Sequence, residues 1–174
     1  ERLGTTIFIA VPTVYRQVLK YGNLESYDLS ALRYGLCAGE PLWPALLDEW
    51  RARAGTELYE SLGMTEISTF ISCSETVPVR PGSAGKPQAG RRVAILRELP
   101  DEPGQTDGVE LPRGEVGLLA VHRSDQGLML GYWRRPAEEA QVMQGDWFVG
   151  GDLASMDEDG YIWFSGRSDD IIKS

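Results

Sequence analysis

Apolar and polar positions alternate along the first third of the chain in a pattern typical of strands and helices. The run from Thr5 to Val11 is apolar and rich in β-branched residues, which predicts a buried strand. Pro12 follows this run and opens an amphipathic helix. We expect its apolar side to carry Val14, Val18 and Leu19.

The same alternation continues to about residue 59. We expect a second strand over residues 33–38, a helix from Pro44 to the terminating Gly55, and a short strand over residues 56–59. Strands that alternate with helices at this spacing predict a parallel sheet, whose ligand sites lie beyond the carboxyl ends of its strands. Two segments follow such ends, Gly39-Glu40 and residues 61–66.

The pattern changes near Val77. From Pro78 on, Pro and Gly recur between short alternating segments, which predicts a small sheet or barrel. Residues 99–107 are polar and rich in turn formers, so we expect an exposed loop there. Strands are expected at residues 93–96, 114–122, 147–148 and 161–164, and a helix at 136–144.

Composition limits the possible partners. The 174 residues, 42% of them hydrophobic, are enough to bury one good core or two small ones. Seventeen Lys and Arg against 26 Asp and Glu give a net charge of -9, which repels nucleic acids and acidic membranes. The longest apolar run, Ile7 to Val11, is far shorter than the roughly 20 residues of a membrane span. We therefore expect no nucleic-acid partner and no membrane span.

Cysteine and histidine are scarce. Cys37 and Cys73 form no CxxC pair, and His122 is the only histidine, so the chain has too few soft ligands for a structural zinc site. We expect free thiols in a reducing compartment, and hence a cytoplasmic protein. His122 has no nucleophile nearby in the sequence, which favours a histidine at a strand end. The aromatic residues of the second half are expected in the core: Tyr132, Trp133, Trp147, Tyr161 and Trp163.

The segment Leu62-Gly63-Met64-Thr65-Glu66 carries the most distinctive candidate chemistry. Gly63 would let a ligand approach the backbone, Thr65 would donate a hydrogen bond to a phosphate oxygen, and Glu66 would hold Mg²⁺. A carboxylate beside a phosphate requires such a cation between them. Alternatively, Thr65 and Glu66 cap a following helix, and the pair taken alone favours this cap.

Three further segments have two interpretations each. Residues 82–87 would cradle an anion or form a turn into the second half; they lack the spacing of a P-loop, which favours the turn. Asp152 would accept hydrogen bonds from the two hydroxyls of a ribose, or would be a turn aspartate. Arg167 would reach a ribose or phosphate, or would form a surface ion pair with Asp169 or Asp170.

The order of these motifs resembles the adenylate-forming superfamily, which includes acyl- and aryl-CoA synthetases, luciferases and the adenylation domains of peptide synthetases. The resemblance implies an α/β fold: residues 1–77 end a parallel α/β layer, and residues 78–174 form a small β-rich subdomain, a distorted barrel. It also implies a ligase that uses ATP and Mg²⁺ to activate a small carboxylic acid as an acyl-adenylate and passes the acyl group to CoA. A homodimer remains open. The Gly-Glu-Pro-Leu turn and the Gly-Arg-x-Asp-Asp ending favour CoA ligases of medium-chain or aromatic acids.

The resemblance assigns roles to residues of this chain. Thr65 would bind the α-phosphate and Glu66 would coordinate Mg²⁺, which makes these two the catalytic pair. Glu60 would contact the adenine amino group, and Asp169 would be the hinge to a C-terminal domain. The residues implied in nucleotide binding are Gly39, Glu40, Pro41, Glu60, Ser61, Leu62, Gly63, Asp152 and Arg167. The acyl pocket would draw on Val11, Ala38, Gly39 and Gly63.

The chain also departs from the family pattern. Leu62 replaces an aromatic residue that usually stacks on adenine, and Gly151 stands where Thr is common, with a smaller expected effect. The family's phosphate loop and its C-terminal lysine would lie outside residues 1–174. The sequence therefore predicts a fragment that is inactive alone. Two alternatives remain, an adenylation domain that loads a carrier protein and a non-catalytic interaction module of the same fold.

Overall fold

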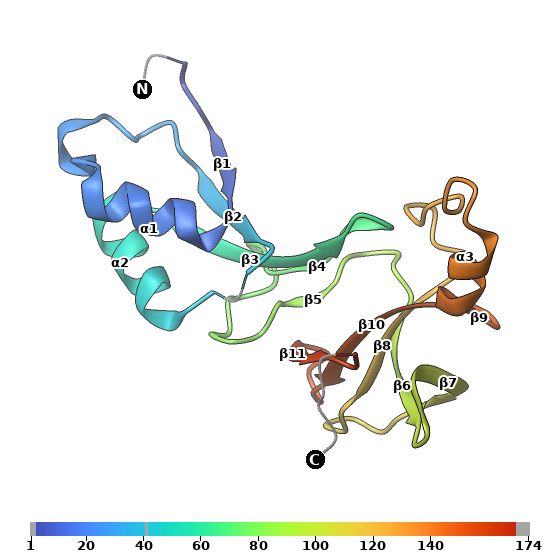
Figure 1. Cartoon of the computed structure of the whole chain (residues 1–174). Coiled ribbons are helices and arrows are strands. Elements are labelled where there is room, and N and C mark those ends of the chain that lie inside the picture. The colour runs from blue at the N-terminus through green and yellow to red at the C-terminus, as the bar shows by residue number, and fades with distance from the viewer. Residues whose placement is uncertain (1–2, 41, 170–174) are drawn as a thin grey trace. The chain divides into compact units, whose positions relative to one another are not determined.

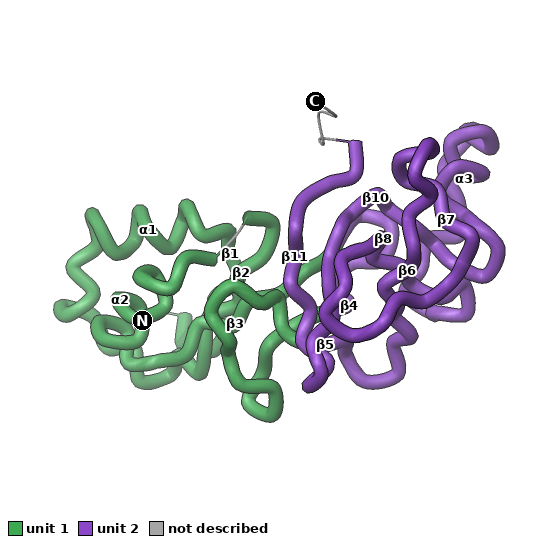
Figure 2. Tube along the Cα trace, turned by 90° about the horizontal axis from the view of Figure 1, so that it is seen from below, with its two compact units in different colours: residues 1–63, 71–85 green, residues 64–70, 86–174 purple. Residues whose placement is uncertain are grey.

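The computed structural model describes residues 3–40 and 42–169. It divides into two compact units (Figure 2): unit 1 is residues 1–63 with 71–85, and unit 2 is residues 64–70 with 86–174. The domain boundary expected at residues 77 and 78 stays a prediction. Among the described residues, no helix is both long and apolar enough to cross a bilayer.

Unit 1 contains the predicted strand and helix alternation (Figure 1). Its parallel strands are β1 (Ile7–Ala10), β2 (Tyr34–Ala38) and β3 (Glu57–Met64), and its helices are α1 (Pro12–Tyr21), α2 (Pro44–Ala54) and the short η1 (Leu24–Ser26). The register pairs Ala10 with Cys37 and Ala38 with Ser61. The expected parallel α/β layer is confirmed, and β3 continues to Met64, beyond the predicted end at residue 59.

The core of unit 1 explains which side of α1 is buried. Phe8 of β1, Tyr15 of α1 and Trp50 of α2 form one aromatic cluster, in which the Tyr15 and Trp50 rings meet edge to face at 4.8 Å. Ile9, the next residue of β1, is 66% exposed because successive strand residues face opposite sides. The expectation for α1 is confirmed for Leu19, which is buried, and for Val18, which packs against the core, but it was wrong for Val14, which is 39% exposed. Pro12 and Tyr15 are the other buried residues of this helix.

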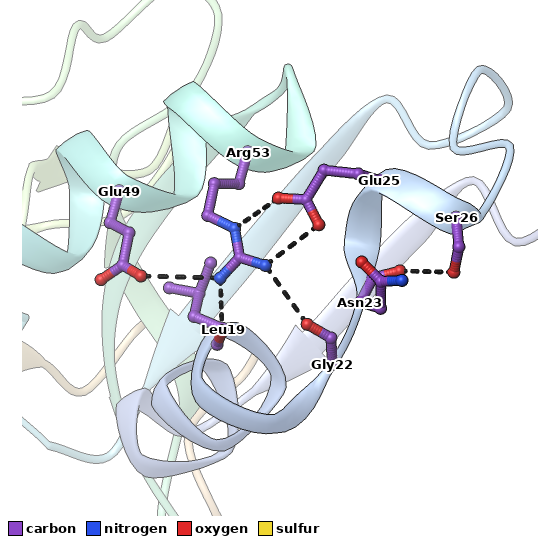
Figure 3. A network of polar contacts seen from close by, with 7 residues as sticks. All are labelled: Leu19, Gly22, Asn23, Glu25, Ser26, Glu49 and Arg53. Atoms are coloured by element: carbon purple, nitrogen blue, oxygen red, sulfur yellow. Dashed lines mark hydrogen bonds and ion pairs between the residues drawn. The ribbon is translucent and has the colours of Figure 1, made fainter.

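Arg53 joins the two helices (Figure 3). Its guanidinium donates to the Leu19 carbonyl, to the Gly22 carbonyl at 3.2 Å, and to Glu25 at 2.8 and 3.2 Å. Glu49, one turn earlier on α2, lies 3.7 Å away. Because the last carbonyls of a helix lack partners within it, Arg53 completes the C-terminal end of α1 from the neighbouring helix.

Unit 2 is built on an antiparallel sheet with the strand order β11-β10-β8-β6-β7, and β9 pairs with β10. These strands are β6 (Val93–Leu99), β7 (Glu102–Glu110), β8 (Gly117–His122), β9 (Met143–Gln144), β10 (Trp147–Met156) and β11 (Ile162–Arg167). The Gln144 side chain accepts from the Thr106 N–H at 2.9 Å and donates to the Gly104 carbonyl at 2.8 Å. These bonds connect β9 to the far edge strand β7, so the expected distorted barrel is confirmed.

The expected loop over residues 99–107 is wrong. The strands β6 and β7 form a hairpin there, and Arg97 pairs with Asp107 across it. Both faces of β7 are largely exposed, so its polar sequence reflects exposure and not the absence of a strand. Three further elements complete the chain: β4 (Ser68–Ser72), β5 (Lys86–Pro87) and α3 (Pro136–Val142).

Candidate functional site

The carboxyl ends of β1 and β2 bring together three of the four residues expected to line an acyl pocket. Val11 and Ala38 directly follow the paired residues Ala10 and Cys37. Gly39 has a φ of 89°, and a Cβ at this position would lie 3.6 Å from Cγ1 of Val11. The fourth residue, Gly63, is exposed and lies two positions after Ser61, the register partner of Ala38.

Glu40 connects this edge to the start of α1. Its carboxylate accepts a hydrogen bond from the Thr13 hydroxyl at 2.8 Å and lies 3.7 Å from the Arg16 guanidinium. The side chain is therefore held toward α1 in the described structure. Pro41, which the resemblance places beside the adenine, lies outside the described residues, as does Asp170.

Glu60 and Ser61 are largely enclosed within unit 1. Burial raises the pKa of Glu60 to about 7, although the carboxyl also accepts a hydrogen bond from the Leu42 backbone, which lowers it. The buried Ser61 hydroxyl donates to the Cys37 carbonyl at 3.3 Å. Burial also raises the pKa of the Cys37 thiol to about 12, with smaller contributions from Glu60 and Glu40. Both cysteines are free and buried, which agrees with the expectation of free thiols.

Thr65 and Glu66 lie in the turn between β3 and β4, closed by a hydrogen bond from the Ile67 N–H to the Met64 carbonyl at 3.2 Å. The helix-cap interpretation is wrong, because the strand β4 follows the turn and not a helix. Thr65 is exposed and Glu66 is partly buried. The half-buried Leu62 precedes them on β3.

Glu66 is held by residues that sequence reasoning did not assign to the site. The Tyr132 hydroxyl donates to Oε1 of Glu66 at 2.7 Å, and the Met129 N–H donates to the Glu66 carbonyl at 2.6 Å. Tyr132 was expected only in the core. The signal in the sequence is the run Gly131-Tyr132-Trp133, a glycine followed by two aromatic residues. The neighbouring Trp133 was also expected in the core, which is wrong, because it is 85% exposed.

Asp152 and Arg167 are partners across β10 and β11, and Arg167 donates to the Asp152 carboxylate at 3.2 Å. The same guanidinium binds Asp169 through two nitrogen atoms, at 2.8 and 3.2 Å. Burial raises the pKa of Asp152, Arg167 opposes that shift, and the charges of Asp169 and Glu66 add to it. Glu66 is the smallest of these contributions, and Glu66, Asp152 and Arg167 all belong to unit 2.

A bulge in β10 presents Asp152. The register of β10 against β8 shifts between Val149 and Leu153, and Gly151 has a φ of 85°. A Cβ on Gly151 would lie 3.1 Å from the Arg167 guanidinium. The backbone conformation and the closeness of Arg167 both favour glycine at this position, and the small effect expected of this departure from the family pattern stays a prediction.

The other sequence candidates lie in structural positions. Gly85 has a φ of 99°, and a Cβ there would lie 2.2 Å from the Ser72 backbone, so residues 82–87 include a glycine required for close packing. His122 ends β8, where its ring meets Trp147 edge to face at 5.3 Å. Its Nδ1 lies 2.7 Å from the Ser124 hydroxyl. The expectation of a strand-end histidine is confirmed.

Comparison with known proteins decides the family. The family model described as "AMP-binding enzyme" matches residues 1–133. The chain belongs to the AMP-binding enzyme family.

Relatives within this family carry ligase names. The chain is 38% identical to YtcI of Bacillus subtilis, named as an uncharacterized acyl-CoA ligase, over all 174 residues but only 31% of that protein. It is also similar to the anthranilate CoA ligase AuaEII in complex with anthranoyl-AMP, with a TM-score of 0.82 and 35% identity. This match covers 99% of this chain and 31% of that one. For the O-succinylbenzoate CoA synthetase MenE of Bacillus subtilis, in complex with ATP and magnesium ion, the TM-score is 0.82 at 28% identity, over 99% of this chain and 34% of the other. The chain thus spans about a third of the proteins it matches.

The oxygen ligands that this chain offers around Glu66 fit a nucleotide-borne magnesium ion. Within residues 3–40 and 42–169, no three His, Cys, Asp or Glu side chains gather to hold a metal. Mg²⁺ does not require such a cage, because it keeps several waters and binds through one or two carboxylates together with substrate phosphates. The Glu66 carboxylate, in the turn that also carries the exposed Thr65, is a ligand of this kind.

Proposed function

We propose that the full-length protein is an ATP-dependent acyl-CoA ligase, which activates a carboxylic acid as an acyl-adenylate and transfers the acyl group to CoA. The observation that carries this proposal is the arrangement within unit 2. Tyr132 holds the Glu66 carboxylate in the turn that also carries the exposed Thr65, and Arg167 donates to the Asp152 carboxylate within the same unit. Each group has a counterpart in MgATP: a metal ion, a phosphate and a ribose.

The proposed roles follow from the donors and acceptors. Thr65 donates to an oxygen of the α-phosphate, and Glu66 coordinates the magnesium ion. When bound, Mg²⁺ would neutralise charge on the phosphate oxygens while the substrate carboxylate attacks the α-phosphorus and pyrophosphate leaves. Asp152 accepts from the ribose hydroxyls, and Arg167 favours its ionised form. Positioning and charge stabilisation by such groups account for most of the catalysis of phosphoryl and nucleotidyl transfer.

Unit 1 supplies the contacts proposed for the base and the acid. Glu60, with its pKa of about 7, bonds to the adenine amino group, near the turn that begins at Gly39. Val11, Ala38 and Gly63 contribute to the acyl pocket. These positions are small or aliphatic, which suits the apolar part of a carboxylic acid.

Pyrophosphate exchange by the full-length protein tests the proposal. A panel of aliphatic and aromatic acids should include one that drives exchange of labelled pyrophosphate into ATP. We expect Glu66→Gln and Asp152→Ala to abolish exchange, while the exposed Glu102→Gln retains it as a matched control. Unchanged exchange in either site variant would contradict the assigned roles.

The acceptor is tested separately. Thioester formation with free CoA, in the absence of any carrier protein, is expected of a ligase. Transfer only to a carrier protein would indicate an adenylation domain instead. Leu62 favours a third candidate, a non-catalytic module, because it cannot stack on adenine as an aromatic ring does. A full-length protein that binds no ATP and exchanges pyrophosphate with no acid would establish that candidate.

A further inference from the structure

The Glu66 carboxylate is oriented by a tyrosine that lies 66 positions away in the sequence. Tyr132 donates its hydroxyl hydrogen to Oε1 of Glu66 at 2.7 Å. In the described part of the chain, this is the only hydrogen bond to the Glu66 carboxylate, which leaves Oε2 for another partner.

The segment that carries Tyr132 also holds the backbone of the turn. The Met129 N–H donates to the Glu66 carbonyl at 2.6 Å. Residues 129–132 therefore contact Glu66 at two points, one on its main chain and one on its side chain. A two-point contact fixes both the position of the residue and the rotation of its carboxylate.

Tyr132 is itself held in place by α3. Its backbone N–H donates to Oε2 of Glu139 at 3.2 Å. The preceding Gly131 has a φ of 149°, and a Cβ there would lie 2.5 Å from the same Glu139 oxygen. Glycine at position 131 thus allows the close approach that seats Tyr132 between Glu139 and Glu66.

Two roles are compatible with a phenol bonded to a carboxylate. The bond would either only join two surface segments, or would also decide which oxygen the carboxylate presents. Carboxylates that bind metals are usually hydrogen-bonded by outer partners, and loss of such a partner typically costs about 10–100-fold in metal affinity or activity. Since the carboxylate of Glu66 is bonded at Oε1 alone among described residues, its geometry matches the second role.

We propose that Tyr132 is a positioning residue, which holds Glu66 through Oε1 so that Oε2 faces the magnesium ion of the bound nucleotide. This inference rests on the proposed function. Tyr132 does not touch the reacting atoms and acts only through Glu66. Its loss should therefore weaken the use of the metal more than the rate at saturating metal.

The test uses the full-length protein and the Tyr132→Phe variant, which loses one hydroxyl and keeps the ring. Binding of Mn²⁺ in the presence of a non-hydrolysable ATP analogue is measured from the electron paramagnetic resonance signal of free Mn²⁺. We expect the Mn²⁺ affinity to fall about 10-fold or more. The Mg²⁺ concentration that half-saturates pyrophosphate exchange should rise similarly. Tyr21→Phe, at an exposed position of α1, is the matched control and should change neither value.

Two additional variants separate positioning from folding. Gly131→Ala keeps the hydroxyl but strains the backbone at a φ of 149° and displaces the Glu139 carboxylate that accepts from the Tyr132 N–H, so it should also weaken Mn²⁺ binding. In a Glu66→Gln background, Tyr132→Phe should not change the Mn²⁺ affinity further, because Tyr132 acts only through the Glu66 carboxylate. Unchanged Mn²⁺ affinity in Tyr132→Phe, with or without a lowered melting temperature, would overturn the proposal.

The proposed function is tested by a different measurement from the one that tests the role of Tyr132. If the wild-type protein exchanges no pyrophosphate with any acid, the ligase assignment is lost, while the Mn²⁺ measurement still decides the role of Tyr132. If exchange occurs but Tyr132→Phe leaves the Mn²⁺ affinity and the Mg²⁺ requirement unchanged, only the role of Tyr132 is lost.

Discussion

The guanidinium of Arg167 donates to the carboxylate of Asp152 at 3.2 Å across two antiparallel strands. The Asp152 side chain is only 13% exposed, and burial outweighs Arg167, so the net effect raises its pKa. A charge at this position therefore costs folding free energy that the ion pair only partly offsets. Such a cost is typical of a residue kept for binding and not for stability.

Asp152→Asn should separate these two effects. The folded state raises the pKa of Asp152, so it binds the proton more tightly than the unfolded state does, and the stability contribution of Asp152 falls as pH rises above the usual aspartate range. We expect the Asn variant to be at least as stable as wild type at pH 7.5, with the difference shrinking toward pH 4. Pyrophosphate exchange should fall about 10²-fold or more, because one oriented acceptor is lost. Urea unfolding at both pH values, combined with exchange assays, measures both effects.

Glu60→Gln gives a prediction on pH dependence. Burial raises the pKa of Glu60 from the model-peptide value of 4.5 to about 7. Its stabilising contribution is thus fully present below pH 4.5 and is lost as pH rises through 7. The wild-type protein should lose about 2–3 kcal/mol of unfolding free energy between pH 4.5 and 8 from this group, a loss that Glu60→Gln removes. Parallel unfolding curves for the two proteins across this range would contradict the prediction.

The parallel layer was predictable because its signals are local. Pro12 begins α1, and Gly55 ends α2 at a φ of 70°, so proline and glycine in the sequence mark a boundary of each helix. The hairpin strand β7 was missed because its exposed faces carry polar residues, which resemble a loop in sequence. Gln144 bonds to residues of β7 that are 38 and 40 positions away in the sequence. The spacing of apolar residues along the chain does not predict contacts between such distant residues.

The candidate site was predictable only in part, and the reason is again distance along the chain. The motif around Thr65 and Glu66 is contiguous, whereas the tyrosine that orients Glu66 comes from a segment after β8. The cap interpretation failed because the residue types of a helix cap also suit a strand-to-strand turn. Tertiary structure, not local preference, decided between them.

Leu62→Tyr tests the departure of this chain from the aromatic residue that the family usually places there. Leu62 is half-buried on β3, three residues before Thr65. Stacking of a base on an aromatic ring contributes about 1–3 kcal/mol, so a tyrosine should lower the KM for ATP about 5-fold or more. Leu62→Met, which adds no ring, is the control and should leave the KM unchanged. A tyrosine variant with unchanged KM for ATP and unchanged stability would show that this position does not meet the base.

Gly151→Thr introduces the residue that is common in the family at this position. Gly151 has a φ of 85°, a conformation that costs a β-branched residue about 1–2 kcal/mol or more, and its Cβ would lie 3.1 Å from the Arg167 guanidinium. We expect lower stability and, because Arg167 must move, weaker pyrophosphate exchange. Gly160→Thr is a matched control: Gly160 also has a φ of 85°, but no atom lies within 4 Å of the added Cβ. Both variants should lose similar stability in urea unfolding, whereas only Gly151→Thr should raise the KM for ATP; an equal change in KM would show that strain, and not the displacement of Arg167, is the cause.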